Sequence, residues 1–398
     1  MRCLGYRAVF IWGLFLYGAG ALVAIPAIKL HSFEAFCVCV FTMGSGLGAI
    51  ETAASPYVTA CGPTKFAEIR ITTSQALSGI GSVMAPLLGS YIFFDCDDYA
   101  AHRNVQWVHL AIGACALTLA MIFLFVRIPE ITDTDMIYQV AEAHTVDNDL
   151  CSVKKFNLIH ATFAQFCFTG AQITLTRSAS ITNVHFVRLE LLTGMTSHFI
   201  DYVTETQDGF TTAQASRLLA GAQGVYLASR LAGIPLMHLF KPRTVFGVYL
   251  TLCIVFIVPA MTRQEKGGLA FLYVTFFFAS VCFPSILGLG MRGLGRDTKR
   301  GSGWIIAGIL GGAIAPLVTS HVGDMFSSPV SMVVPLSLLF GALSYAIAVN
   351  FVPRYKNIID AYTPANVASD PTNDSAEDVR SQRARTEKQR SSSWPFRR

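Results

Sequence analysis

FCVCVFTMGSGLGAIETAASPYVTACG, from Phe36 to Gly62, is an apolar run in which Glu51 is the only charged residue. A run of this length can cross about 30 Å of hydrocarbon as a helix. A carboxylate inside such a helix is costly, and it usually faces a cavity, a proton path or a substrate. Glu51 is therefore the residue from which the fold and the function can be argued together.

The composition of the whole chain is that of a membrane protein. Of its 398 residues, 53% are hydrophobic and only 14% are charged, which is far from the balance of a soluble domain. Similar runs recur, and they are continuously apolar rather than alternating, which favours helices over the strands of a barrel. The sequence predicts an all-α, polytopic protein with ten transmembrane helices, at residues 8–28, 34–57, 71–94, 107–127, 157–176, 212–238, 244–262, 269–291, 303–322 and 331–352.

The distribution of Lys and Arg among the connections predicts the orientation. Basic residues near the ends of spans stay on the cytoplasmic side. One set of connections, which includes both termini, is rich in them, whereas the opposite set is poorer and contains the acidic DCDDY at Asp95–Tyr99. We therefore expect both termini to be cytoplasmic, and we expect a plasma-membrane protein. The net charge of +5 follows from this topology and indicates no nucleic-acid partner.

The polar segment 129–156 divides the chain into unequal parts. Residues 1–128 hold four of the predicted spans and residues 157–352 hold six. Residues 353–398 are rich in Ser, Thr, Asp and Arg and cannot bury enough apolar surface to fold alone, so we predict a disordered cytoplasmic tail. Residues 176–211 have no clear spanning pattern, and they are interpreted as an external loop.

No metal site, cofactor site or enzyme active site is indicated. The nine His and ten Cys are scattered, without HExxH, HxxxH or CxxC. GLGRDTKRGSG at Gly293–Gly303 matches neither GxGxxG nor the P-loop pattern, and it is interpreted as a tight basic turn between two spans.

Glu51 is one of a few polar residues in the predicted spans. Glu51 and Ser55 are four residues apart, so they share a helix face, and Gln75 and Ser78 do so at a spacing of three. The alternative for Glu51 is a position near the cytoplasmic headgroups, beside Arg70.

The second part of the chain carries Gln165 and Gln172, seven residues apart on one predicted span, and Arg230 on the next. Amides commonly join transmembrane helices, which is the alternative to a binding role for each Gln. Arg230 is costlier to bury, and we expect it to be paired within the bundle. Phe168, Tyr226 and Phe283 could stack on a sugar ring, but with 29 Phe in the chain we expect most aromatic residues to face lipid or to be packed.

Several motifs resemble one family. ETAASPYVTACGPTKFAEIRITTSQALSGIGSVMAPLLG at Glu51–Gly89 resembles the segment written roughly ETAANPYVxxLGPxxxAxxRLNLAQAFNGLGxxxGPLLG in the L-fucose permease family of proton-coupled sugar symporters, within the major facilitator superfamily. LLAGAQGVYLASRLAG, from Leu218, is similar to the eighth span of that family. The stretch from Cys282 to Asp324 is similar to its tenth and eleventh spans, and PEITDTDM, from Pro129, is similar to fungal members.

The resemblance implies two six-helix halves, alternating access and a central sugar site. It implies that Glu51 couples proton binding to sugar binding and that Gln75 matches the family's Gln, whereas Ser55 and Ser78 stand where the family has Asn. A carboxylate can serve both cargoes, because it accepts hydroxyl hydrogen bonds when ionised and takes up a proton when desolvated. The predicted substrate-binding residues are Glu51, Ser55, Gln75, Ser78, Gln165 and Gln172.

We therefore predict proton-coupled symport of a hexose or deoxyhexose by a monomer whose partners are the sugar, protons and membrane lipid. The alternatives are a sugar-sensing membrane protein and a non-functional truncated transporter. MRCLGYR at Met1–Arg7 resembles the loop before the family's third span, so we expect the first two spans to be missing and the chain as written to be inactive in transport.

Overall fold

The computed structural model describes residues 5–30, 32–61, 66–92, 98–126, 150–177, 212–262, 266–292, 294, 297–325 and 332–360. Within these ranges every regular element is a helix and none is a strand, which confirms the all-α fold class. Most of the predicted central loop, the predicted external loop from residue 178 on, and the predicted tail from residue 361 on lie outside the described residues.

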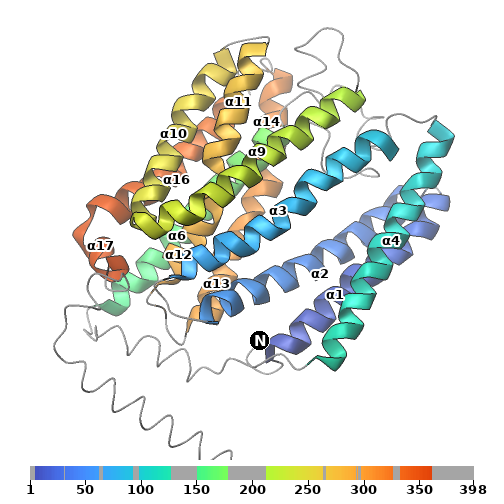
Figure 1. Cartoon of the computed structure of the whole chain (residues 1–398), viewed down its shortest axis with the longest axis horizontal. Coiled ribbons are helices and arrows are strands. Elements are labelled where there is room, and N and C mark those ends of the chain that lie inside the picture. Colours follow the sequence, from blue (N-terminus) through green and yellow to red (C-terminus); the bar gives the residue numbers. More distant parts are fainter. Residues whose placement is uncertain are drawn as a thin grey trace, which may run out of the picture.

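Long helices dominate both parts of the chain (Figure 1). The first part consists of α1 (Gly5–Lys29), α2 (Phe33–Ala60), α3 (Ala67–Ile92) and α4 (Asp98–Phe125). The described helices of the second part are α6 (Leu150–Arg177), α9 (Thr212–Leu239), α10 (Pro242–Thr262), α11 (Lys266–Ala279), α12 (Cys282–Met291), α13 (Thr298–Ala307), the 3₁₀ turn η3 (Gly308–Leu310), α14 (Gly311–Met325), α16 (Val333–Phe351) and α17 (Pro353–Asp360).

Helices occupy all ten of the predicted spans, but two of those spans are interrupted. The predicted span 269–291 breaks between α11 and α12, and the span 303–322 contains η3 between α13 and α14. Among the described residues, seven helical stretches are long and apolar enough to cross a membrane. The remaining long helices, α3, α6 and α9, are less apolar, and they carry Gln75, Gln165, Gln172 and Arg230.

The segment predicted to be a disordered tail begins instead with a folded helix, α17, so the prediction is wrong for these residues. Tyr355 and Ile359 of α17 are buried. Asp360 accepts hydrogen bonds from Arg243 Nε at 2.9 Å and Arg243 Nη2 at 3.1 Å. Composition alone suggested disorder because these tertiary contacts, made to the start of α10, cannot be seen in a local window.

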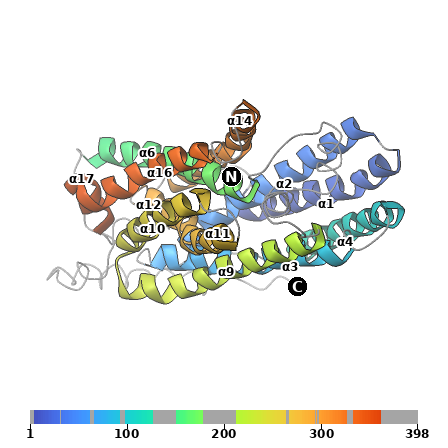
Figure 2. The same ribbon diagram turned by 90° about the horizontal axis from the view of Figure 1, so that it is seen from above.

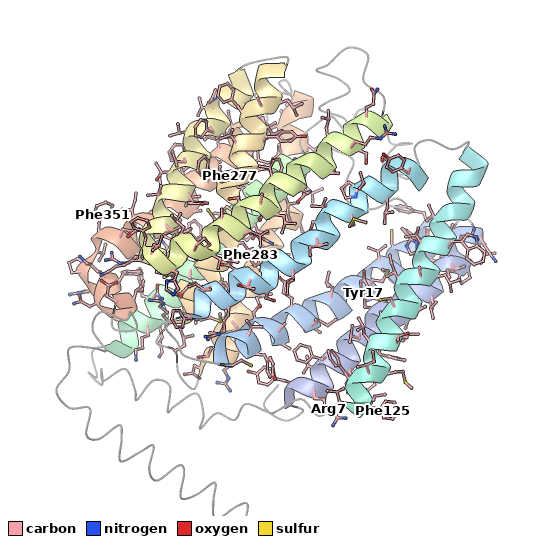
Figure 3. The ribbon with its side chains drawn as sticks, viewed as in Figure 1. Arg7, Tyr17, Phe125, Phe277, Phe283 and Phe351 are labelled. Atoms are coloured by element: carbon pink, nitrogen blue, oxygen red, sulfur yellow. The ribbon has the colours of Figure 1, made fainter. Side chains whose placement is uncertain are left out.

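α1 is held tightly by its neighbours. A Cβ at Gly13 of α1 would lie 2.9 Å from the carbonyl oxygen of Gly46 in α2, and one at Gly46 would lie 2.5 Å from the carbonyl oxygen of Gly13. The two backbones can approach this closely because neither residue has a side chain. Arg7 donates to the carbonyl oxygens of Phe123, at 3.0 Å, and Leu124, so it ties the start of α1 to the end of α4 (Figure 3).

The main hydrophobic core lies in the second part of the chain. Phe168, Phe246, Leu250 and Tyr345 are fully buried there, where α6, α10 and α16 pack together. The core clusters confined to the first part are small, and many large apolar side chains of α1 to α4 are exposed. In a membrane those exposed side chains face lipid, which is the solvent for this surface.

The two parts meet along α3 and α9, which run side by side in Figures 1 and 2. α12 also packs against α3, and α13 packs against α2. The less apolar helices α3 and α9 therefore form the junction between the parts, where their polar residues avoid lipid.

The α1–α2 packing predicts a position-dependent effect of adding one methyl group. Gly46→Ala places a Cβ against the Gly13 backbone and should destabilise the protein by about 1 to 3 kcal/mol, as overpacking usually does. Gly44→Ala is the matched control, because a Cβ at Gly44 meets no atom within 4 Å. Melting temperatures of the purified variants in detergent check this, and equal melting of the two variants would contradict the packing.

Candidate functional site

One face of α2 changes from open to closed along its length. Gly44, Gly48, Glu51 and Ser55 follow one another at helical spacings of four, three and four, so they lie on one face. A Cβ at Gly44 or Gly48 would meet no atom within 4 Å. Glu51 is half-buried, and Ser55 is only 8% exposed. The carboxylate therefore lies where open space gives way to packed protein.

Glu51 forms no hydrogen bond or ion pair with any residue that the structure describes. Arg70, which the sequence suggested as a neighbour, donates instead to the carbonyl oxygens of Val58 at 3.0 Å and Thr59 at 2.5 Å. The arginine therefore connects the start of α3 with the end of α2. It leaves the Glu51 carboxylate available for a proton or a ligand.

α3 carries Gln75 and Ser78. Gln75 is half-buried and Ser78 is exposed, and the Ser78 hydroxyl donates to the Gln75 carbonyl oxygen at 2.9 Å. Gly81, one turn further along, is another position at which a Cβ would meet no atom within 4 Å. This face of α3 is therefore polar and open, as the face of α2 is at Gly44 and Gly48.

α6 contributes the two glutamines. Gln165 is 1% exposed and donates to the Thr169 hydroxyl at 3.3 Å, whereas its Oε1 accepts no hydrogen bond from the described residues. Gln172, two turns later, donates to the Tyr226 hydroxyl at 2.8 Å. An unsatisfied buried acceptor is costly, so Gln165 Oε1 is a natural position for a hydroxyl donor.

Arg230 connects three segments at the junction of the two parts. It is 6% exposed, and it donates from Nη1 to the Gln75 carbonyl oxygen at 2.6 Å and from Nε to the Ser280 carbonyl oxygen at 3.2 Å. Its Nη2 donates to the Tyr226 hydroxyl at 3.1 Å. The expectation that Arg230 is paired is confirmed, although these partners are carbonyl and hydroxyl oxygens rather than a carboxylate.

A buried ion pair closes one end of the region. Glu68 at the start of α3 is 0% exposed, and its Oε1 and Oε2 accept hydrogen bonds from Arg292 Nε at 2.6 Å and Nη2 at 2.8 Å. Glu68 fits against Gly288 of α12, where a Cβ would lie 2.6 Å from the Glu68 Cγ. Arg292 also donates to the Ile359 carbonyl oxygen of α17 at 2.7 Å. This pair was not predicted from the sequence.

The predicted site residues thus fall into three groups. Glu51 and Ser55 share α2, while Gln75, Ser78 and Gln172 join one network that includes Arg230 and Tyr226. Gln165 lies outside that network, on α6. All are bounded at one end by the Glu68–Arg292 pair and by the packing of α13 on α2, and the ribbons of α2 and α3 diverge away from that end (Figure 1).

Long apolar helices in two parts, with polar side chains at the junction between the parts, are the arrangement of a membrane transporter. Residues 1–316 match the Major Facilitator Superfamily, and the chain belongs to this family. It is a multi-pass membrane transporter and not an enzyme, as the sequence predicted.

The relatives that this chain matches include sugar transporters. The chain is 27% identical over 367 residues to an L-fucose-proton symporter of Escherichia coli (strain K12), a match that covers 87% of this chain and 78% of that protein. It is 24% identical over 346 residues to a glucose/galactose transporter of Brucella abortus biovar 1 (strain 9-941), covering 84% and 76%. These matches confirm the resemblance seen in the motifs.

Solved structures of transporters share the fold of this chain. The crystal structure of the transporter FucP in the outward conformation matches with a TM-score of 0.67 and 25% identity, over 87% of this chain and 83% of that one. The proton:xylose symporter XylE bound to 6-bromo-6-deoxy-D-glucose matches with a TM-score of 0.64 and 15% identity, over 88% and 81%. The second match shows the shared fold alone.

The Glu68–Arg292 pair predicts a large stability effect. Glu68→Gln leaves a buried guanidinium without its carboxylate, which should cost about 3 to 5 kcal/mol. Lys241→Gln removes the Lys241–Asp360 ion pair, whose lysine is 46% exposed, and this control should cost about 1 kcal/mol or less. Denaturant unfolding of the detergent-solubilised proteins measures both. An effect of Glu68→Gln no larger than that of Lys241→Gln would contradict the assignment.

Proposed function

We propose that the protein carries a hexose or deoxyhexose across the membrane together with a proton, by alternating access between its two parts. The observation that carries the proposal is the half-buried Glu51 carboxylate, which has no partner among the described residues and lies beside open positions of α2. The matches to an L-fucose-proton symporter and to glucose/galactose transporters support the substrate class.

The polar groups at the junction suit a neutral, hydroxyl-rich ligand. An ionised Glu51 offers acceptor oxygens to sugar hydroxyls. When Glu51 is protonated, the protein can change conformation without an unpaired charge at this position. Gln165 Oε1 offers a buried acceptor, and Gln75 offers both a donor and an acceptor. Ser55 and Ser78 have short side chains, which leave room that a larger amide would fill.

We infer that the end closed by Glu68 and Arg292 faces the cytoplasm. The helix ends on this side carry most of the basic residues, which is the pattern of cytoplasmic connections. The described basic residues at this end are Arg7, Arg70, Lys154, Lys155, Lys241, Arg243, Arg292, Arg300, Arg354 and Lys356. Both termini are then cytoplasmic, and the structure is an outward-open state of a monomer in the plasma membrane.

Release of sugar to the cytoplasm then requires the two parts to separate at their closed end. The Glu68–Arg292 pair joins α3 of the first part to the residue after α12 in the second, so this pair must break or rearrange. The exposed carboxylate and guanidinium are hydrated in the inward-open state, which offsets the lost pairing. The pair therefore contributes to the balance between the two states rather than to sugar binding.

Replacing the proposed proton carrier tests the mechanism. Glu51→Gln keeps the shape and hydrogen bonding of the side chain but removes its titratable group, so sugar binding should persist while acid-driven accumulation is lost. Labelled sugar uptake into proteoliposomes, with and without an imposed proton gradient, measures this.

Glu34→Gln provides the matched control, because Glu34 is an exposed carboxylate in the first turn of the same helix. This variant should accumulate sugar as the wild type does. Acid-driven accumulation by Glu51→Gln at the wild-type rate would remove Glu51 from the coupling step. Sugar binding by the wild type without any accumulation would contradict transport itself.

Ser78→Asn tests the substrate assignment. The longer amide reaches further into the open space beside α3, so relative uptake among fucose, galactose and glucose should shift by about tenfold or less, the effect of one hydrogen bond. Thr73→Asn, at an exposed position on another side of α3, should leave the ratios unchanged. Unaltered ratios for Ser78→Asn would place Ser78 outside the sugar site.

A further inference from the structure

The hydroxyl group of Tyr226 is held in an unusual hydrogen-bonding position. Tyr226 is 5% exposed on α9, and its oxygen accepts hydrogen bonds from Gln172 Nε2 at 2.8 Å and from Arg230 Nη2 at 3.1 Å. Both contacts use lone pairs of the phenol oxygen. The phenol proton is thus left to donate, and it finds no acceptor among the residues that the structure describes.

A buried hydroxyl proton without an acceptor is costly unless a ligand or water supplies one. The two donors also change its character, because hydrogen bonds in a chain polarise one another and a charged donor polarises most strongly. The Tyr226 O–H is therefore a strengthened donor. The two residues that donate to it, Gln172 and Arg230, belong to different helices, α6 and α9, so the fold fixes the direction of the O–H group.

The location of this donor is that of the proposed sugar site. Arg230 donates both to the Tyr226 hydroxyl and to the Gln75 carbonyl oxygen, so Tyr226 is linked to α3 by two hydrogen bonds through Arg230. Gln172 is itself one of the candidate substrate-binding residues. The hydroxyl consequently lies on α9, which packs against α3 at the junction of the two parts, and it is bonded to Gln172 of α6.

We propose that Tyr226 is a specificity-determining residue whose O–H donates a hydrogen bond to one hydroxyl oxygen of the bound sugar, with Gln172 and Arg230 as the residues that position it. This rests on the proposed function, since the acceptor is a sugar. A site built to donate to one hydroxyl discriminates against the analogue that lacks it, because the donor is then left unpaired.

A structural role for Tyr226 makes a different prediction. If the hydroxyl only orients Gln172 and Arg230, then its removal disturbs the site as a whole and weakens every sugar by the same factor. If it contacts one hydroxyl, then one monodeoxy analogue is exempt, because that analogue never had the hydrogen bond to lose. Removal of the Tyr226 hydroxyl and removal of that sugar hydroxyl are then non-additive in binding free energy, which is the coupling that a double-mutant cycle measures.

The experiment is equilibrium binding of labelled sugars to the full chain in lipid nanodiscs, for the wild type and Tyr226→Phe. The panel is the tightest-binding hexose and its monodeoxy analogues. The wild type should bind one analogue about 3- to 10-fold more weakly than the parent. Tyr226→Phe should weaken the parent by the same factor and leave that analogue unchanged.

Tyr345→Phe is the matched control, because Tyr345 is fully buried and its hydroxyl already donates to Asn157 Oδ1 at 3.1 Å. It should leave the preferences across the panel unchanged. 3-Fluorotyrosine at position 226 gives a second test that keeps the side chain: the stronger donor should tighten binding of the parent and not of the exempt analogue.

An equal loss across all sugars in Tyr226→Phe, or no loss at all, would overturn the assignment of Tyr226 while leaving the proposed function intact. If fluorotyrosine tightens every sugar alike, the assignment also fails. Absence of binding by every sugar to the wild type would instead overturn the proposed function, and the Tyr226 assignment with it.

Discussion

A charged side chain that is kept from water must be paired, neutralised by a proton or offered to a ligand, and this constraint organises the structure. Arg292 and Glu68 satisfy it by a bidentate ion pair in which both side chains are buried. Arg230 satisfies it with two carbonyl oxygens and a phenol. Glu51 satisfies it with no described residue, and that exception is what points to a proton and a sugar.

The three solutions have different consequences for motion. The Glu68–Arg292 pair joins the two parts near the start of α3, and Arg292 also binds the main chain of α17, so α17 is connected to this contact. Arg230 spans the same junction near Gln75 through a carbonyl oxygen, which carries no charge of its own. Separation of the parts therefore exposes a full ion pair at the end and only a single guanidinium at Arg230.

Much of the fold could be predicted from the sequence, because apolar runs are local. The described parts of the ten predicted spans are helical, apart from the two breaks, and Glu51 in the run from Phe36 to Gly62 indicated the proposed site. The breaks at Ser280 and at η3 were not predicted, although Pro284 follows the first break by four residues and Gly308, Gly311 and Gly312 lie at the second. The Glu68–Arg292 pair joins residues 224 positions apart, and the Tyr226–Gln172 bond joins residues 54 apart, so neither was visible before the helices were placed.

The central claim is that sugar and proton cross together, with Glu51 as the shared site. The most direct measurement is the change in external pH when sugar is added to de-energised, unbuffered vesicles that contain the wild-type protein. The account predicts alkalinisation that follows sugar entry in a fixed ratio and is abolished by Glu51→Gln. Sugar entry without any pH change, or equal alkalinisation by Glu51→Gln, would contradict it.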